Sequence, residues 1–248
     1  MLLVIVVIVF ISMLYLLLIQ LIEHAVASFI FAMIGGVYFY KKGYNYISKK
    51  IEIEMEESLD RIRRGKLFYA VDGLLEVKNI YKKWRFFFSK TIDGQIGMLY
   101  YMTLNYKKAA PFLERAMSTD WMAKTMLAVI AYKKKDYEKM DKVFEKALRY
   151  SFNSSFVWSV WAYCYWRMGK IDHAIQILSR ARGSFGTFKG YFGGTEEKIV
   201  YNLTNIRNGK KMKMNVFGQD WNMLHLEQGK YVDFGPGQVT RFGRKGFH

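Results

Sequence analysis

The first forty residues contain no Lys or Arg and a single acidic residue, Glu23. One helix of this length would extend about 60 Å, twice the roughly 30 Å of a bilayer's hydrocarbon core. Two shorter helices with a turn near residues 20–24 fit the same composition better. Residues 1–40 are therefore expected to form two transmembrane helices, of which the second is the shorter.

A cleaved signal peptide is the alternative explanation of such a start. The sequence Ala25-Val26-Ala27 resembles a cleavage site. However, no basic residue precedes the first apolar run, and a second apolar run follows the candidate site at once, which signal peptides do not show. Two uncleaved helices are therefore favoured.

Four lysines follow the second apolar run, in a basic juxtamembrane segment at residues 41–50: Lys41, Lys42, Lys49 and Lys50. Basic flanks favour the cytoplasmic side of a membrane. We therefore expect a multi-pass protein of the cell inner membrane, with the chain after residue 40 in the cytoplasm. The turn with Glu23 and His24 would lie outside, either as a polar turn at the lipid–water boundary, which we favour, or as a proton-handling pair.

Three small residues, Ser28, Ala32 and Gly36, recur every four positions in the second apolar run. Residues four apart share one face of a helix, and small side chains there let two helices approach closely. This face is expected to pack against the first helix or against a partner's helix in the membrane. The first helix is the default, because it is covalently adjacent.

The chain after residue 40 has a different composition. It carries all 38 Lys and Arg residues and 20 of the 21 Asp and Glu residues, a net charge of +18. Such a basic domain attracts anionic partners, whether acidic proteins, anionic lipid or nucleic acid. Aromatic residues make up 17% of the chain and prolines number two, so a disordered chain is disfavoured and an all-α fold is expected.

A repeat becomes visible when the chain is shifted against itself by 34 residues. Residues of similar size then coincide: Ala128 with Ala162, Tyr132 with Trp166, Tyr137 with Ile171, Phe144 with Leu178, and Ala147 with Ala181. Lys135 falls on Gly169 in the same alignment. A fixed period of this length predicts stacked helix pairs, each too small to bury its own apolar face.

The most complete copy spans residues 155–188, with large and small residues in a characteristic order: Trp158, Ala162, Tyr165, Gly169, Ala174, Leu178 and Ala181. In this order and spacing the segment resembles the tetratricopeptide repeat. Further copies, at about 51–86, 90–120 and 121–154, extend the resemblance over residues 51–190. It implies an α-solenoid of about four helix pairs, whose first helices line a concave surface that binds other proteins.

The repeats depart from the family pattern at three kinds of position, one of which is Met140, where a small residue is expected. The proline expected near the end of each unit is missing, and Phe152 stands at that place in one copy. The charged residues with which some family members hold the C-terminal carboxylate of a chaperone are not recognisable at their usual places. A receptor for chaperone tails is therefore disfavoured.

The end of the chain divides into two parts. Residues 195–208 begin with Thr195 followed by two acids, a typical helix start, and are expected to form a helix that caps the solenoid. Residues 209–248 form a basic tail rich in glycine and aromatic residues, among them Trp221, Tyr231 and Phe234. The tail is either a flexible solvated segment or an arm that docks on a partner through its aromatic residues.

No grouping of residues in the sequence indicates catalysis. The four histidines do not occur with Cys, Asp or Glu at metal-ligand spacing, and Cys164 is the single cysteine. Cys164 is expected to be a small core residue. Gly209-Lys210-Lys211 lacks the other residues of a phosphate-binding loop. We therefore expect a protein that is not an enzyme and that has no metal or cofactor.

The leading hypothesis is a membrane-anchored protein-interaction scaffold, or an assembly subunit of a larger membrane-associated complex. Its partners would be other proteins of that complex and membrane lipids. The candidate partner-binding residues are the aromatic residues of the predicted first helices and of the tail: Trp121, Tyr132, Trp158, Trp166, Trp221, Tyr231 and Phe234.

Two other functions stay open. A membrane-tethered nucleic-acid-binding protein would use the basic and aromatic residues interleaved at 81–86 and the lysines at 133–135. A small integral subunit of a transport or energy-converting complex would use the hairpin itself.

Overall fold

The computed structural model describes residues 2–22, 25–63, 67–84, 87–186 and 195–227. Every regular element in these ranges is a helix, which confirms the predicted all-α class. The chain divides into two compact units, which we call the hairpin unit, Met1–Ile92, and the repeat unit, Asp93–Asp233.

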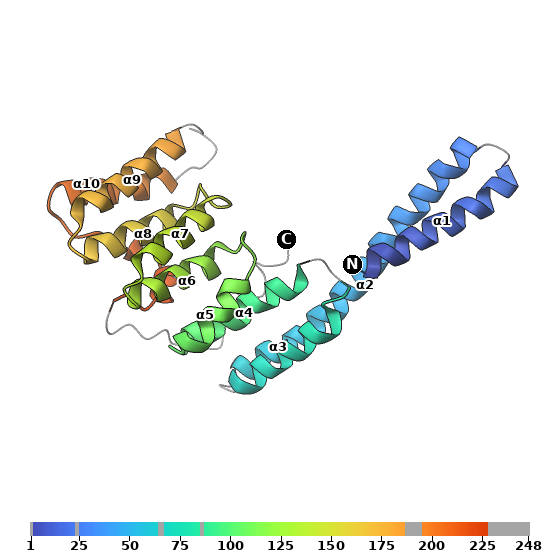
Figure 1. Cartoon of the computed structure of the whole chain (residues 1–248), viewed down its shortest axis with the longest axis horizontal. Coiled ribbons are helices and arrows are strands. Elements are labelled where there is room, and N and C mark those ends of the chain that lie inside the picture. Colours follow the sequence, from blue (N-terminus) through green and yellow to red (C-terminus); the bar gives the residue numbers. More distant parts are fainter. Residues whose placement is uncertain (1, 23–24, 64–66, 85–86, 187–194, 228–248) are drawn as a thin grey trace. The chain divides into compact units, whose positions relative to one another are not determined.

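The hairpin unit consists of α1 (Leu2–Ile22), α2 (Ala25–Arg63) and α3 (Leu67–Tyr81). Figure 1 shows α1 lying antiparallel against the first half of α2, and α3 lying along the second half. Helix α2 runs unbroken for 39 residues. The second apolar run, the basic segment 41–50 and the predicted first helix of the repeat at 51–86 are thus one helix, because the Lys and Glu residues after Tyr40 are good helix formers and no proline interrupts them.

One stripe of residues along α2 contacts both α1 and α3. Its members recur at helical spacing and are buried: Ser28, Ala32, Gly36, Ile47, Ile51, Met55 and Ser58. A Cβ atom added at Gly36 would clash with the side chain of Ile11 in α1, and one at Gly73 of α3 would meet the Ser58 hydroxyl. The first half of the stripe, which has small side chains, therefore packs against α1, and the second half packs against α3. The predicted packing residues Ser28, Ala32 and Gly36 lie at the contact with α1.

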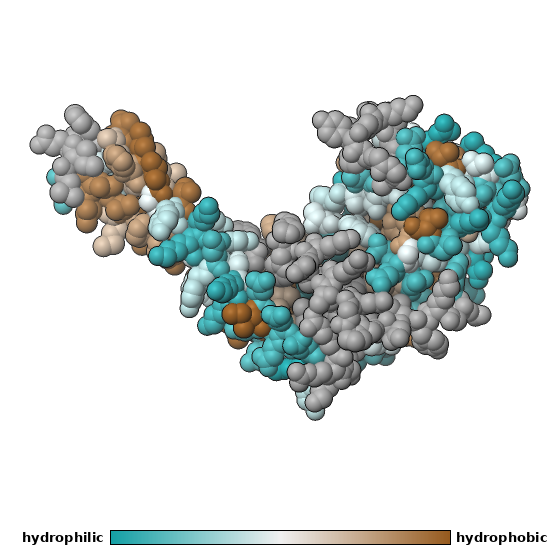
Figure 2. Space-filling view, turned by 180° about the vertical axis from the view of Figure 1, so that it is seen from behind, coloured by the Kyte–Doolittle hydropathy of each residue, from teal (hydrophilic) through white to brown (hydrophobic). Residues whose placement is uncertain are grey.

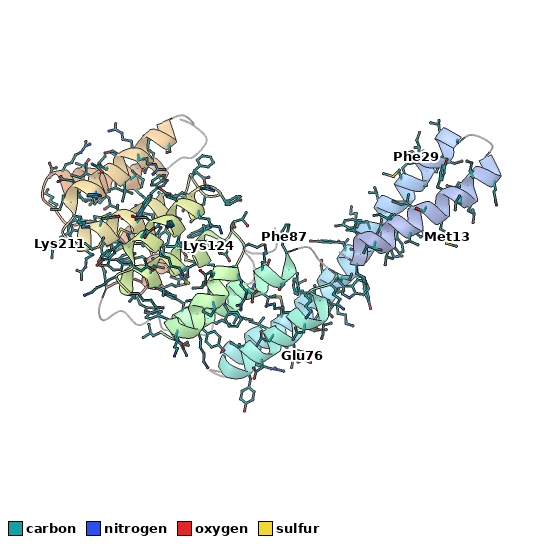
Figure 3. All side chains as sticks on the ribbon, in the orientation of Figure 1. Met13, Phe29, Glu76, Phe87, Lys124 and Lys211 are labelled. Carbon is teal, nitrogen blue, oxygen red and sulfur yellow. The ribbon has the colours of Figure 1, made fainter. Side chains whose placement is uncertain are left out.

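The outer face of the hairpin is apolar and exposed. Met13 on α1 and Phe29 on α2, both labelled in Figure 3, are 69% and 54% exposed. Figure 2 shows hydrophobic surface over this hairpin and hydrophilic surface farther along α2. By length and composition, one described helix could cross a membrane, α1 over Leu2–Gln20, and only 11% of this span is buried. Signal sequences have the same properties, and the second predicted span is not supported by this criterion.

The repeat unit contains the helices after α3, with α4 beginning just before the boundary. The helices are α4 (Phe88–Met102), α5 (Tyr106–Arg115), α6 (Trp121–Lys133), α7 (Tyr137–Leu148), α8 (Ser155–Arg167), α9 (Ile171–Gly186) and α10 (Thr195–Arg207). A short 3-10 helix, η1 (Asn215–Phe217), and α11 (Gln219–Asn222) follow. The pairs α6–α7 and α8–α9 lie within the predicted ranges 121–154 and 155–188, and α4–α5 begins two residues before the predicted range 90–120. Helix α10 packs on α9 and α8.

The turns inside the helix pairs repeat the same backbone conformation. Leu104, Lys135 and Gly169 hold equivalent positions and have φ angles of 61°, 62° and 76°. A left-handed residue reverses the chain within three residues, so the two helices of each pair pack antiparallel. This shared geometry explains why Lys135 and Gly169 coincide in the 34-residue alignment, although their side chains have nothing in common.

Each pair depends on close approach of its two helices. A Cβ atom at Gly97 of α4 would lie 2.9 Å from the backbone nitrogen of Leu113 in α5. Ala128 and Ala162, the equivalent residues of the next two first helices, are fully buried. Small residues at these positions place the helix axes near enough for the larger side chains around them to interdigitate.

We predict that Gly97→Ala destabilises the repeat unit by about 1–3 kcal/mol, because its methyl group meets backbone that cannot move aside. The measurement is denaturant unfolding of the full chain in mild detergent, followed by the fluorescence of the five tryptophans in this unit. Gly183→Ala is the matched control, since nothing lies within 4 Å of its added Cβ. It is expected to be neutral or stabilising by up to about 1 kcal/mol, and equal losses in both variants would contradict the packing explanation.

Candidate interaction surface

The first helices of the pairs, α4, α6 and α8, together with α10 form the inner face of the repeat unit. In the tetratricopeptide-like arrangement this is the face expected to bind a partner. In the structure it is contacted by the chain itself, through residues 211–226, which we call the C-terminal segment. The segment contacts α10 first, then α8, and finally α6 and α4, opposite to the order of the helices in the chain.

The start of the C-terminal segment is held on α10. The Asn202 side chain, fully buried, accepts a hydrogen bond from the Lys213 backbone N–H at 2.8 Å and donates one to the Lys213 carbonyl at 3.4 Å. Met212 and Met214, on either side, are buried. One amide side chain thus replaces two backbone partners and fixes the register of the segment, since a shift by one residue would break both bonds.

The middle of the segment packs on α8 through aromatic rings. The Phe217 ring contacts Phe156 edge to face, with centroids 5.3 Å apart, and Trp121 of α6 contacts the same Phe156 ring at 5.6 Å. Trp221 contacts Tyr163 edge to face at 4.6 Å and is 2% exposed. Burial of this tryptophan makes it the main apolar anchor of the segment.

The end of the segment is fixed by two hydrogen bonds to backbone carbonyls. The Tyr101 hydroxyl of α4 donates to the Leu224 carbonyl at 2.6 Å, inside the core, and the Lys133 ammonium of α6 donates to the His225 carbonyl at 3.0 Å. The His225 ring stacks on Tyr101 with centroids 6.3 Å apart. Because a buried carbonyl without a donor is costly, the Tyr101 hydroxyl is an essential partner of this segment.

These contacts decide between the two interpretations of the tail for residues 211–226. This part docks through its aromatic residues, as one interpretation predicted, but on helices of its own chain and not on a partner, and a solvated segment is the wrong description of it. The aromatic candidates Tyr231 and Phe234 lie outside the described residues.

Of the five remaining partner-binding candidates, two are buried and three are partly exposed. Trp158 and Trp221 are 3% and 2% exposed, so they are core residues, and their assignment to a partner surface is corrected. The Trp158 indole N–H donates to the Phe152 carbonyl at 2.9 Å, and the Arg180 guanidinium lies over its ring. Large aromatic residues at helical spacing face the core as readily as a partner, which the sequence alone did not resolve.

Trp121, Tyr132 and Trp166 are partly exposed. Trp166 lies against Tyr163, with centroids 5.5 Å apart, beside the ring that receives Trp221. These three side chains come from the first helices α6 and α8. They are therefore the predicted candidates that the structure leaves accessible near the C-terminal segment.

Two polar groups that face neighbouring helices, one partly buried and one buried, were missed by the sequence analysis. The Asp141 carboxylate of α7 accepts hydrogen bonds from the Trp161 indole at 2.8 Å and from the Tyr165 hydroxyl at 2.7 Å, which joins α7 to α8. Burial, together with this bond to a carboxylate, raises the pKa of Tyr165 well above its ordinary value. A carboxylate on an otherwise charged helix carries no sequence signal that it faces inward.

The second is Lys124, labelled in Figure 3, which is 2% exposed in the first turn of α6. Its ammonium donates to the carbonyls of Leu113 at 2.9 Å and Glu114 at 3.0 Å, in the last turn of α5. A cation at a helix C-terminus satisfies carbonyls that have no partner within the helix and interacts favourably with the helix dipole. Lys124 is thus a structural cap for its neighbour.

No three His, Cys, Asp or Glu side chains within the described ranges are grouped to hold a metal ion. Cys164 is buried, as expected of a core residue, and burial raises the pKa of its thiol far above the ordinary value. Such a thiol stays protonated and is unreactive at neutral pH.

Comparison with protein families agrees with this geometry. A tetratricopeptide repeat model matches residues 123–154, which contain α7 and all but the first two residues of α6. Searches of curated proteins and of solved structures gave no match. The chain therefore contains a tetratricopeptide-like repeat, and repeats of this kind are typical of protein–protein interaction scaffolds.

We predict that Tyr101→Phe detaches the end of the C-terminal segment, because the buried Leu224 carbonyl loses its donor at a cost of about 1–3 kcal/mol. The measurement is hydrogen exchange of the amides of residues 211–226. Tyr150→Phe, at a residue that is 59% exposed, is the control and should leave exchange unchanged. Unaltered protection in the Tyr101 variant would show that the hydroxyl does not hold the segment.

We also predict that acid loosens the segment. Burial lowers the pKa of His225 below its ordinary 6.5, and the Lys133 ammonium lowers it further, whereas a backbone hydrogen bond to Met102 raises it. The contribution of neutral His225 to stability is complete above about pH 6.5 and is lost as the pH falls through the lower pKa of the folded state. The protection factors of residues 211–226, measured relative to intrinsic exchange at each pH, should therefore fall between pH 7.5 and pH 5 more steeply in the native chain than in His225→Asn; parallel profiles would contradict this role.

Proposed function

We propose that this protein is a membrane-anchored scaffold that holds other proteins of a membrane-associated complex. The observation that carries the proposal is the covalent union of a tetratricopeptide-like repeat with an exposed apolar hairpin. The repeat supports protein binding. The hairpin supports anchoring, because α1 is long enough, apolar enough and uncovered over most of its surface.

Because the C-terminal segment covers the inner face, a partner protein would contact the residues that stay exposed around it. With residues 211–226 docked there, a partner meets the partly exposed Trp121, Tyr132 and Trp166 beside the segment. Partly exposed aromatic side chains with neighbouring cations, such as Lys133 and Arg167, are typical of binding hot spots. We propose this aromatic rim as the first contact of a partner protein.

The anchoring would place the repeat unit in the cytoplasm, at the inner membrane. The support is the distribution of charge, since Lys41, Lys42, Lys49 and Lys50 follow the apolar run and are all exposed on α2. The positive-inside tendency puts such a cluster on the cytoplasmic side. With both α1 and the first half of α2 in the bilayer, the chain's start and its repeat unit would share that side.

The decisive experiment is the native mass of the protein extracted from its own membrane with mild detergent after an alkaline wash, with identification of co-migrating proteins. We expect the protein to resist the wash and to migrate in a defined particle much larger than its own 29.2 kDa. Trp166→Ala should release partners while the repeat unit stays folded, whereas Tyr150→Ala should retain them. Protease should digest the repeat unit in inverted vesicles and spare it in spheroplasts.

Release by the alkaline wash would overturn anchoring. Migration of the wild-type protein as a free species of its own mass would overturn stable membership of a complex, and sensitivity in spheroplasts would reverse the orientation.

A further inference from the structure

Helices α1 and α3 lie end to end along the same stripe of α2, and their junction brings two distant segments together. The Leu2 backbone N–H, at the start of α1, donates to the Lys83 carbonyl at 2.7 Å. On the other side of the same helix end, a Cβ at Gly43 of α2 would lie 3.0 Å from Leu3. Residues 82–84, just after α3, are therefore held at the level where the apolar hairpin ends, beside residues 41–44.

This junction carries a concentrated positive charge. Six lysines on the two segments are exposed: Lys41, Lys42, Lys49, Lys50, Lys82 and Lys83. Neither residues 41–50 nor residues 77–84 include an acidic residue. Acidic residues begin at Glu52, farther from the apolar end of α2, and the Glu54 carboxylate there accepts a hydrogen bond from the Tyr81 hydroxyl at 2.7 Å. The charge along the hairpin unit thus changes from none, to basic, to mixed.

Aromatic side chains accompany the lysines. Trp84 is partly buried, and Tyr40 and Tyr46 are 40% and 71% exposed. Trp and Tyr are enriched where a membrane protein passes from hydrocarbon to headgroups, because their rings are apolar and their edges form hydrogen bonds. We call the six lysines together with Trp84, Tyr40 and Tyr46 the basic collar.

The length of α1 places the collar at one membrane surface. The 19 residues of Leu2–Gln20 extend about 28 Å, which matches a hydrocarbon core of roughly 30 Å. When α1 crosses the bilayer, Leu2 lies at one boundary, and its bond to Lys83 keeps the turn after α3 at the same boundary. In the sequence this turn follows the hairpin by some forty residues, and the bond to Leu2 brings the two together.

We propose that the basic collar is a binding site for the headgroups of anionic phospholipids, built from both α2 and the turn after α3. The inference rests on the proposed anchoring and extends it to a lipid class. Lysines within a Debye length of an anionic surface are attracted to it, and here the lysines of two segments converge on one headgroup layer. The collar orients the hairpin unit by its charge as well as by its apolar surface.

The test is electron paramagnetic resonance of the full chain reconstituted in phosphatidylcholine vesicles. The probes are traces of phosphatidylglycerol or phosphatidylcholine spin-labelled near the end of the acyl chain. We expect a motionally restricted lipid population that prefers the phosphatidylglycerol probe at low salt. Lys82→Gln with Lys83→Gln should lower the preference, by up to roughly fivefold per lysine, and 1 M salt should abolish it.

The matched control is Lys134→Gln with Lys146→Gln, which removes two exposed lysines from the repeat unit and should leave the preference intact. Absence of any restricted lipid would overturn the anchoring itself. Restricted lipid without preference for the anionic probe, or a preference unaffected by the changes at Lys82 and Lys83, would overturn the collar while leaving the anchoring in place.

Discussion

Close approach of paired helices at small residues is the constraint on which the rest of this structure depends. In the hairpin unit it occurs at Gly36, where a side chain would displace Ile11. In the repeat unit it occurs at Gly97, whose position is met by the backbone of Leu113. Where the backbones come near, larger neighbours such as Phe144 and Leu178 fill the remaining space and are fully buried. The two units differ in what they expose, but both are built on this packing.

The C-terminal segment gives the repeat unit its second distinguishing property. Stacked helix pairs leave an inner face formed by their first helices, and here that face is closed by residues 211–226. The contacts are of two kinds: hydrogen bonds from Asn202, Tyr101 and Lys133 to backbone, and burial of aromatic and apolar side chains. Backbone recognition fixes position with little regard to side chains, whereas burial of Trp221, Met214 and Leu224 removes apolar surface from water.

The C-terminal segment on the inner face affects how the protein would bind partners as a scaffold. A partner that approaches the inner face meets a surface made jointly by helix side chains and by the chain's own segment. The hairpin, with its apolar exterior and basic collar, would hold that surface at a membrane. Charge and hydrophobicity thus divide along the chain, with an exposed apolar hairpin at the start and the tetratricopeptide-like repeat after it.

The sequence by itself determined the helical class, the 34-residue period and the positions of three helix pairs, because these follow from local spacing and from turns whose backbone is set by a few residues. It also pointed to Ser28, Ala32 and Gly36, since small residues four apart form a pattern without reference to any other part of the chain. It did not predict that α2 continues unbroken past residue 50. Helix-forming residues permit this continuation, but only the structure shows α1 and α3 covering one stripe of α2 from opposite ends.

Burial and long-range pairing were decided only by the tertiary structure. Trp158 and Trp166 look equivalent as aromatic residues of one helix, yet only the first is buried, because α7 and α9 cover one side of α8. The inward orientation of Lys124 and Asp141 depends on acceptors and donors in neighbouring helices. The docking of Leu224 on Tyr101 joins residues 123 positions apart. A sequence pattern records which residues share a face of one helix, whereas the partner of that face is chosen by packing among segments that the pattern does not relate.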